Sequence, residues 1–175
     1  MAKVKERRAF VKENGLDAYA PESFKQAEAR FASAEKTYGS DNEASKKDLE
    51  AALPLYEKTV ADGFAAKIAE KRATAQAERE KADAEKARVA AKTAYAAGDA
   101  AFTKAGSDAE AKKYVEAVSG YEESTKRFRE AAATAAERRA RARTALDSAG
   151  TTIKTTEDRL KAIDEEMKTE EGGEK

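Results

Sequence analysis

Basic side chains are concentrated in two stretches of this 175-residue chain that could together bind an anion. Such a cluster could hold an anionic polymer, a lipid headgroup or an acidic partner. The alternative is a solvated surface, because intervening glutamates such as Glu70 and Glu137 can neutralise the cations through weak helix-surface pairs. The candidate residues for binding an anion or a partner are Lys67, Lys71, Arg72, Arg138, Arg139, Arg141 and Arg143.

Neighbouring carboxylates are the other groups that could do chemistry. Glu122-Glu123 and Asp164-Glu165-Glu166 could bind Ca²⁺ or act as a general acid and base. They belong to no glycine-bearing ligand loop and no apolar pocket, so a solvated helix face is the expected setting. The chain has no Cys and no His, which removes thiolate chemistry and the commonest general base and metal ligand. We therefore expect no catalytic residue, no metal site, no cofactor and no enzymatic activity.

The composition indicates which elements must position these groups. Lys plus Arg equals Asp plus Glu at 34 each, so the chain is formally neutral although 39% of its residues are charged. Alanine supplies most of the 41% that count as hydrophobic. Ala, Glu, Lys and Arg all favour helices, and only two prolines are present. Long helices with a thin apolar seam are therefore expected. The zero net charge argues against a nucleic-acid partner.

Two turn signals divide the chain. Gly39-Ser40-Asp41-Asn42 follows a helix that begins at Pro21, and Gly106-Ser107-Asp108 supplies a second turn with Glu110 placed for a capping box. We predict helices over about residues 3–14, 21–38, 42–105 and 107–169, all within one elongated domain of residues 1–170, and a flexible tail at 171–175.

An apolar seam runs along the last of these predicted helices. From Ala111 to Met167 apolar or small residues recur at alternating steps of three and four, and Arg139 is the only charged member. A repeat of this kind is typical of a helix that packs lengthwise against another helix. The seam therefore predicts a rod formed with the helix over 42–105.

A hairpin at Gly106 decides which residues meet in that rod. Folding back there places Gly98 against Tyr114, so Gly98 should not tolerate a side chain whereas Gly63 should. It also brings the two basic stretches together in one mid-rod belt. The predicted fold is all-α, an elongated antiparallel helical bundle of long helices, three helices thick at one end and a two-helix, coiled-coil-like hairpin at the other.

A weak internal repeat has a period near 65 residues. Ala52-x-x-x-Tyr56 recurs as Ala117-x-x-x-Tyr121, in each case a small residue and an aromatic residue one helical turn apart. Tetratricopeptide repeats have similar helical hairpins but a period of about 34 residues, so the likeness extends to hairpin packing only.

A resemblance to a known family is carried by Ala18-Tyr19-Ala20-Pro21-Glu22-Ser23-Phe24-x-x-Ala27-Glu28, then Ala34, the polar turn at 39–42, and Ala44 to Tyr56. These residues resemble an alanine-rich helical domain of unknown function from bacterial envelope lipoproteins, where it often precedes an OmpA-type peptidoglycan-binding domain. The resemblance covers about residues 18–60. It implies an exported, cell-envelope setting and a scaffolding or spacer role, and it supplies no catalytic residues. The chain contains neither a lipid-attachment Cys nor an OmpA-type domain.

Membrane insertion is not expected, because no apolar run approaches the roughly 18–20 residues that a span needs. The N-terminus is basic but lacks the apolar run of a signal peptide, so an exported protein would have lost its signal. The expected location is the periplasm or cell envelope, with the cytoplasm left open.

The leading functional hypothesis is a non-enzymatic structural or protein-interaction module, a scaffold or spacer of a bacterial cell envelope. Its partner would be another protein or a second copy of the chain, and peptidoglycan or anionic lipid are further options. The alternative hypothesis is a helical binding module for an anionic ligand or polymer at the mid-rod basic belt.

Overall fold

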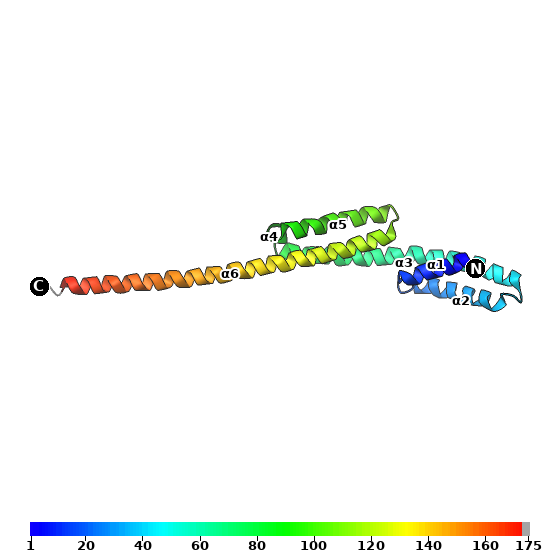
Figure 1. Ribbon diagram of the computed structural model, residues 1–175, viewed down its shortest axis with the longest axis horizontal. Helices are drawn as coiled ribbons and strands as arrows, with labels where there is room; N and C mark the ends of the chain where they lie inside the picture. The colour runs from blue at the N-terminus through cyan, green and yellow to red at the C-terminus, as the bar shows by residue number, and fades with distance from the viewer. Residues whose placement is uncertain (173–175) are drawn as a thin grey trace.

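Helices make up nearly all of the computed structural model, which describes the backbone of residues 1–172 and the side chains of residues 1–168. The described part has no strand, and the predicted all-α fold is confirmed. Figure 1 shows a helical body that carries one long projecting helix. The helices are α1 (Ala2–Glu13), α2 (Pro21–Thr37), α3 (Asn42–Ala84), α4 (Ala87–Ala90), α5 (Lys92–Glu110) and α6 (Tyr114–Gly172).

The first predicted turn is confirmed. The helix α2 has Pro21 in its first turn and ends at Thr37, after which Gly39 takes a positive φ of 89°. Glycine has no Cβ that would strain this conformation. The Asp41 side chain then accepts a hydrogen bond from the Ala44 N–H at 2.9 Å and so caps α3.

The predicted single helix over 42–105 is wrong, because the chain turns back between α3 and α5. Lys86 has a left-handed φ of 60°, and the one-turn helix α4 follows it. Arg88 holds this turn together, donating to Asp83 at 2.7 Å and to the Tyr95 hydroxyl at 3.0 Å. The turn contains neither Gly nor Pro, so the residues that usually mark a turn are missing from it.

The second predicted turn is also displaced. Residues Gly106, Ser107 and Asp108 lie inside α5, and the chain turns later, where Lys112 has a φ of 58°. The predicted helix over 107–169 therefore begins only at Tyr114. At its other end α6 continues through Gly172, so residues 171 and 172 are helical where a tail was expected, and residues 173–175 lie outside the described residues.

The displaced turns reverse the predicted pairing, since α6 lies parallel to α3 and antiparallel to α5. Contacts between α3 and α6 advance together along both chains: Phe64 stacks on Tyr114 with ring centroids 5.4 Å apart, Lys71 pairs with Glu122 at 3.1 Å, and Glu78 pairs with Arg129 at 3.3 Å.

Contacts between α5 and α6 run in opposite directions instead. The rings of Tyr95 and Phe128 lie 5.3 Å apart, and those of Phe102 and Tyr121 lie 5.2 Å apart. Gly98 consequently lies against Phe128, where the hairpin at Gly106 would have placed it against Tyr114. The second half of the body is thus a three-helix unit, and the predicted two-helix hairpin is wrong.

The first half of the body is a three-helix unit of α1, α2 and the beginning of α3. Its core includes Val11, Leu16, Phe31 and Tyr56, each no more than 4% exposed. The helix α3 runs through both halves (Figure 1). The repeat seen in the sequence has a packing counterpart, because both Ala-x-x-x-Tyr pairs, 52/56 and 117/121, are buried.

The remaining part of α6 leaves the body after Ala135. Every residue from 136 to 168 is exposed, and we call this segment the arm. It extends away from the body as a single helix (Figure 1). At 1.5 Å per residue the arm is roughly 50 Å long. This part of the predicted helix was expected to pack along the helix over 42–105, and in the described part of the chain no second helix runs beside it beyond its base.

Candidate functional site

The residues of the predicted basic belt lie in separate parts of the structure. Lys67 donates to the Asn14 carbonyl oxygen at 2.7 Å and lies over the Tyr19 ring, within the first three-helix unit. Lys71 pairs with Glu122 on α6, and the hydrogen bond that Lys71 donates to that carboxylate raises the pKa of Lys71. Arg72 is exposed on the neighbouring face of α3.

The arginines of the second basic stretch lie beyond the end of α3. Arg138 donates to the carbonyl oxygen of Ala90, and Arg139 pairs with Glu85 at 2.6 Å. These two residues fasten the α3–α5 turn to the base of the arm.

The last two arginines belong to the arm itself. Arg141 pairs with Glu137 one turn earlier on the same helix, while Arg143 has no ion pair or hydrogen bond to any described residue. Because α3 and α6 are parallel, Lys67–Arg72 lie beside the beginning of α6 and cannot join Arg138–Arg143 in one belt.

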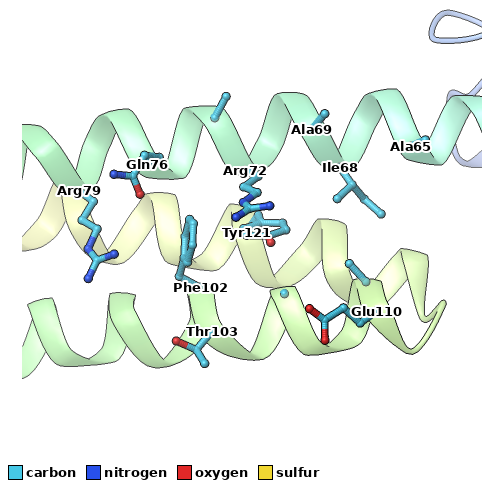
Figure 2. Close-up of a pocket in the computed structure, with 13 residues that line it drawn as sticks. Ala65, Ile68, Ala69, Arg72, Gln76, Arg79, Phe102, Thr103, Glu110 and Tyr121 are labelled. Atoms are coloured by element: carbon cyan, nitrogen blue, oxygen red, sulfur yellow. The ribbon is translucent and has the colours of Figure 1, made fainter.

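A groove between α3 and α5 is a prominent concave feature of the body. It has a volume of about 980 Å³, and Figure 2 shows residues of α3, α5 and α6 around it. Both flanking helices pack on α6 far more extensively than on each other, which leaves the space between them open. The lining residues are Ala65, Ile68, Ala69, Arg72, Ala73, Gln76, Arg79, Phe102, Thr103, Gly106, Ala109, Glu110 and Tyr121.

The groove combines an aromatic floor with a cationic rim. Tyr121 is only 2% exposed, and its hydroxyl has no hydrogen-bond partner among the described residues. Arg79 is held by Asp99 at 2.9 Å, and its hydrogen bond to Tyr95 raises the pKa of Arg79. Arg72 has no ion pair or hydrogen bond in the described part of the chain, so its guanidinium is available to a ligand. Figure 2 shows both arginines extending from α3.

A second cluster of ionisable groups joins the helices of the first unit. Arg8 donates to both carboxylate oxygens of Glu28, at 2.6 and 2.7 Å, and Tyr56 donates to the same carboxylate. The bond from Arg8 lowers the pKa of Glu28, and burial together with the bond to Glu28 raises the pKa of Tyr56. All polar groups of this cluster are paired, so we interpret it as a structural tie between α1, α2 and α3.

The arm carries the most extensive exposed apolar surface in the described chain. Its large apolar side chains are between 51% and 73% exposed although they share one face of the helix. They continue the seam seen in the sequence, whose first half is buried inside the body. We call these residues the arm stripe: Leu146, Ile153, Leu160, Ile163 and Met167.

The described residues contain no helix with the length and apolarity that crossing a membrane requires. They also contain no group of three or more Asp, Glu, His or Cys side chains placed to hold a metal ion. Comparison with known protein families, with curated proteins and with solved structures found no match to this chain.

Proposed function

We propose that this chain is a non-enzymatic structural and protein-interaction module, a spacer in which the folded body carries the arm and the arm docks against a helix. The observation that supports it is the arm stripe, five large apolar side chains each more than half exposed on one face. Monomeric proteins rarely expose a contiguous apolar patch of this kind unless it is an interaction site.

The middle of the arm lacks the charge pairs that stabilise a lone helix in water. This part, from Thr144 to Thr156, has only Asp147 and Lys154 as charged residues, and these are seven positions apart, too far to pair on the helix surface. Gly150 lowers helix propensity further. Since most helical stability comes from packing of an apolar face, a partner helix on the stripe would stabilise the arm.

Gel filtration of an extract from the source cells tests this function. The chain should elute in an assembly larger than its own monomer, and Ile153→Asp with Leu160→Asp should return it to the monomer position. The matched control is Thr151→Asp with Ala162→Asp, which adds the same charge on the opposite face of the arm and should leave the assembly intact. Elution of the parent chain as a monomer would contradict the proposal.

The cell-envelope location is a further part of the proposal, and its only support is the resemblance of residues 18–60 to the envelope lipoprotein domain. Fractionation of the source cells tests it, with the chain expected in the periplasmic or envelope fraction. Recovery in the cytoplasmic fraction would refute the setting without affecting the interaction role.

A second candidate function is binding of an anionic amphiphile in the groove. It is favoured by the unpaired guanidinium of Arg72 beside the apolar floor formed by Phe102 and Tyr121. The fluorescent sulfonate 1-anilinonaphthalene-8-sulfonate is a suitable probe, and Arg72→Gln should weaken its binding, as should added salt. Arg143→Gln is the control, because it removes an equally unpaired charge from the arm. Equal binding by both variants would exclude the groove.

A further inference from the structure

The arm stripe follows a strict seven-residue repeat. Leu146, Ile153, Leu160 and Met167 are spaced by seven, and Ala149, Thr156 and Ile163 follow three positions after the first three of them. In heptad notation these two sets occupy the a and d positions. On a straight α-helix, residues spaced by seven shift around the helix axis by about 20° per heptad. A strict seven-residue apolar repeat stays in contact with a second helix only if the two helices wind around each other in a left-handed supercoil.

Charge is distributed unevenly along the arm. Its base is basic, with Arg138, Arg139, Arg141 and Arg143 within six positions, and its outer part is acidic, with Glu157, Asp158, Asp164, Glu165 and Glu166 outnumbering the cations there. In a parallel pair of such helices the two basic segments would lie side by side, and so would the two acidic segments, so that like charges repel. In an antiparallel pair the basic segment of each arm lies beside the acidic segment of the other arm, so that opposite charges attract.

The positions flanking the seam give the same result. A parallel pair would bring Arg138 beside Arg143 of the second copy and Arg159 beside its Asp164, because the g position of one heptad faces the next e position. The first contact is repulsive and the second attractive, so the flanking charges give a parallel pair little net attraction. An antiparallel pair in which residue i faces about residue 309 minus i packs Leu146 on Ile163 of the second copy and Leu160 on its Ala149. The same register brings Arg143 beside the second copy's Asp164, and the two-fold axis repeats that pair.

From this complementarity we propose that the partner of the arm is a second copy of the same chain, bound antiparallel along the arm stripe. This inference rests on the proposed function and names its partner. The arm projects well clear of the body (Figure 1), so each body lies beyond the end of the other arm and the dimer is an extended dumbbell. Arg143, which has no partner among the described residues of its own chain, gains one in the dimer.

Sedimentation equilibrium of the purified chain tests the dimer. We expect a monomer–dimer equilibrium at micromolar concentration, weakened roughly a hundredfold or more by Ile153→Asp with Leu160→Asp, which buries four carboxylates in the seam. Thr151→Asp with Ala162→Asp should change it little. A purified chain that stays monomeric, or a stripe variant that dimerises like the parent, would overturn the inference. If the same chain is found in a larger assembly in the cell extract, the proposed function stands and its partner is another protein.

Charge exchange tests the orientation. Arg143→Asp should weaken an antiparallel dimer roughly fivefold through two lost pairs, and Arg143→Asp combined with Asp164→Arg should restore it. In a parallel dimer Arg143→Asp would relieve a repulsion with Arg138 and tighten the association. Tightening by the single variant would therefore overturn the antiparallel orientation.

Distance measurement provides an independent readout, because the chain has no native Cys to interfere with labelling. Lys168→Cys carries a dye at the outer end of each arm. The two dyes should be about 40 Å apart in the antiparallel dimer and about 10 Å apart in a parallel one. Energy transfer that corresponds to the short distance would refute the proposed arrangement.

Discussion

Gly120 lies at a close approach of α5 and α6, and Gly120→Ala tests that packing. A methyl group on Gly120 would lie 2.8 Å from Ala105 Cβ and 3.3 Å from Ala105 Cα. Carbon atoms in good contact are about 3.5–4.0 Å apart, so the two helices would have to separate by about 1 Å. Both contacting groups are fixed to backbone and cannot rotate away.

The expected cost follows from two opposing effects. Overpacking costs about 1–3 kcal/mol, and replacing Gly by Ala in a helix gains about 1 kcal/mol. Because rigid atoms take the contact, we place the overpacking in the upper half of its range and expect a net loss of about 1–2 kcal/mol. That loss should lower the melting temperature by roughly 2–8 °C.

Tyrosine fluorescence is the appropriate assay, because every tyrosine precedes residue 122 and so reports on the body without the arm. Gly150→Ala is the control: nothing lies within 4 Å of a methyl group at Gly150, and the transition of the body should not move. The exchange variant Ala105→Gly with Gly120→Ala keeps one Cβ at the crossing and should recover most of the loss. A Gly120→Ala protein as stable as the parent would show that α5 and α6 do not approach this closely.

The remaining predictions concern other contacts of the body, each followed by the same fluorescence transition. Gly63→Ala should destabilise the protein by about 1 kcal/mol or more, since its methyl group would lie 2.8 Å from Leu16 Cβ and 3.1 Å from the Leu16 carbonyl oxygen; unchanged stability would contradict this contact. Phe128→Ala should cost about 3–5 kcal/mol because the ring is fully buried, and a loss below 1 kcal/mol would show that the ring is not in the core. Glu28→Gln should cost about 1–2 kcal/mol at neutral pH. The folded state lowers the pKa of Glu28 below its ordinary value of 4.5, so this stabilisation is present above that pH and is lost as the pH falls through the lowered pKa. The parent and Glu28→Gln should therefore converge in acid, and a constant difference at all pH values would refute the pairing.

The sequence predicted the helical class and the first turn, because composition and the sequence Gly39-Ser40-Asp41-Asn42 act locally. It missed the turn at Lys86, where a non-glycine residue takes a left-handed conformation and the fixing contacts come from Arg88. Gly106 misled the prediction since a lone glycine is tolerated inside a helix when packing compensates. A Cβ at Gly106 would lie 3.6 Å from the Tyr121 hydroxyl, an ordinary van der Waals contact, so the packing there does not require a glycine.

The candidate sites depended on these turns. Arg72 was recognised as a basic residue, but the groove beside it could not be predicted, because α5 faces α3 only once the chain has turned at Lys86. Gly63 was expected to tolerate a side chain since it lies beside the seam, whereas its actual neighbour, Leu16, comes from the loop after α1. The first half of the seam was recognised correctly as a helix-packing surface, and what the sequence did not indicate is that its second half has no partner in the described part of the chain.

The ring of Phe64 links the two halves of the body, and this bears on the order in which the chain folds during synthesis. On one side it contacts Phe10, with centroids 6.1 Å apart, and on the other it stacks on Tyr114. The first three-helix unit has all of its own residues once the ribosome has passed Lys67, but Tyr114 emerges only after α5 has been made. The nascent first unit therefore carries a half-covered aromatic side chain, which α6 covers when it docks. We therefore expect folding during synthesis to proceed from the N-terminus towards the arm, with the first unit offering the surface on which the second one nucleates.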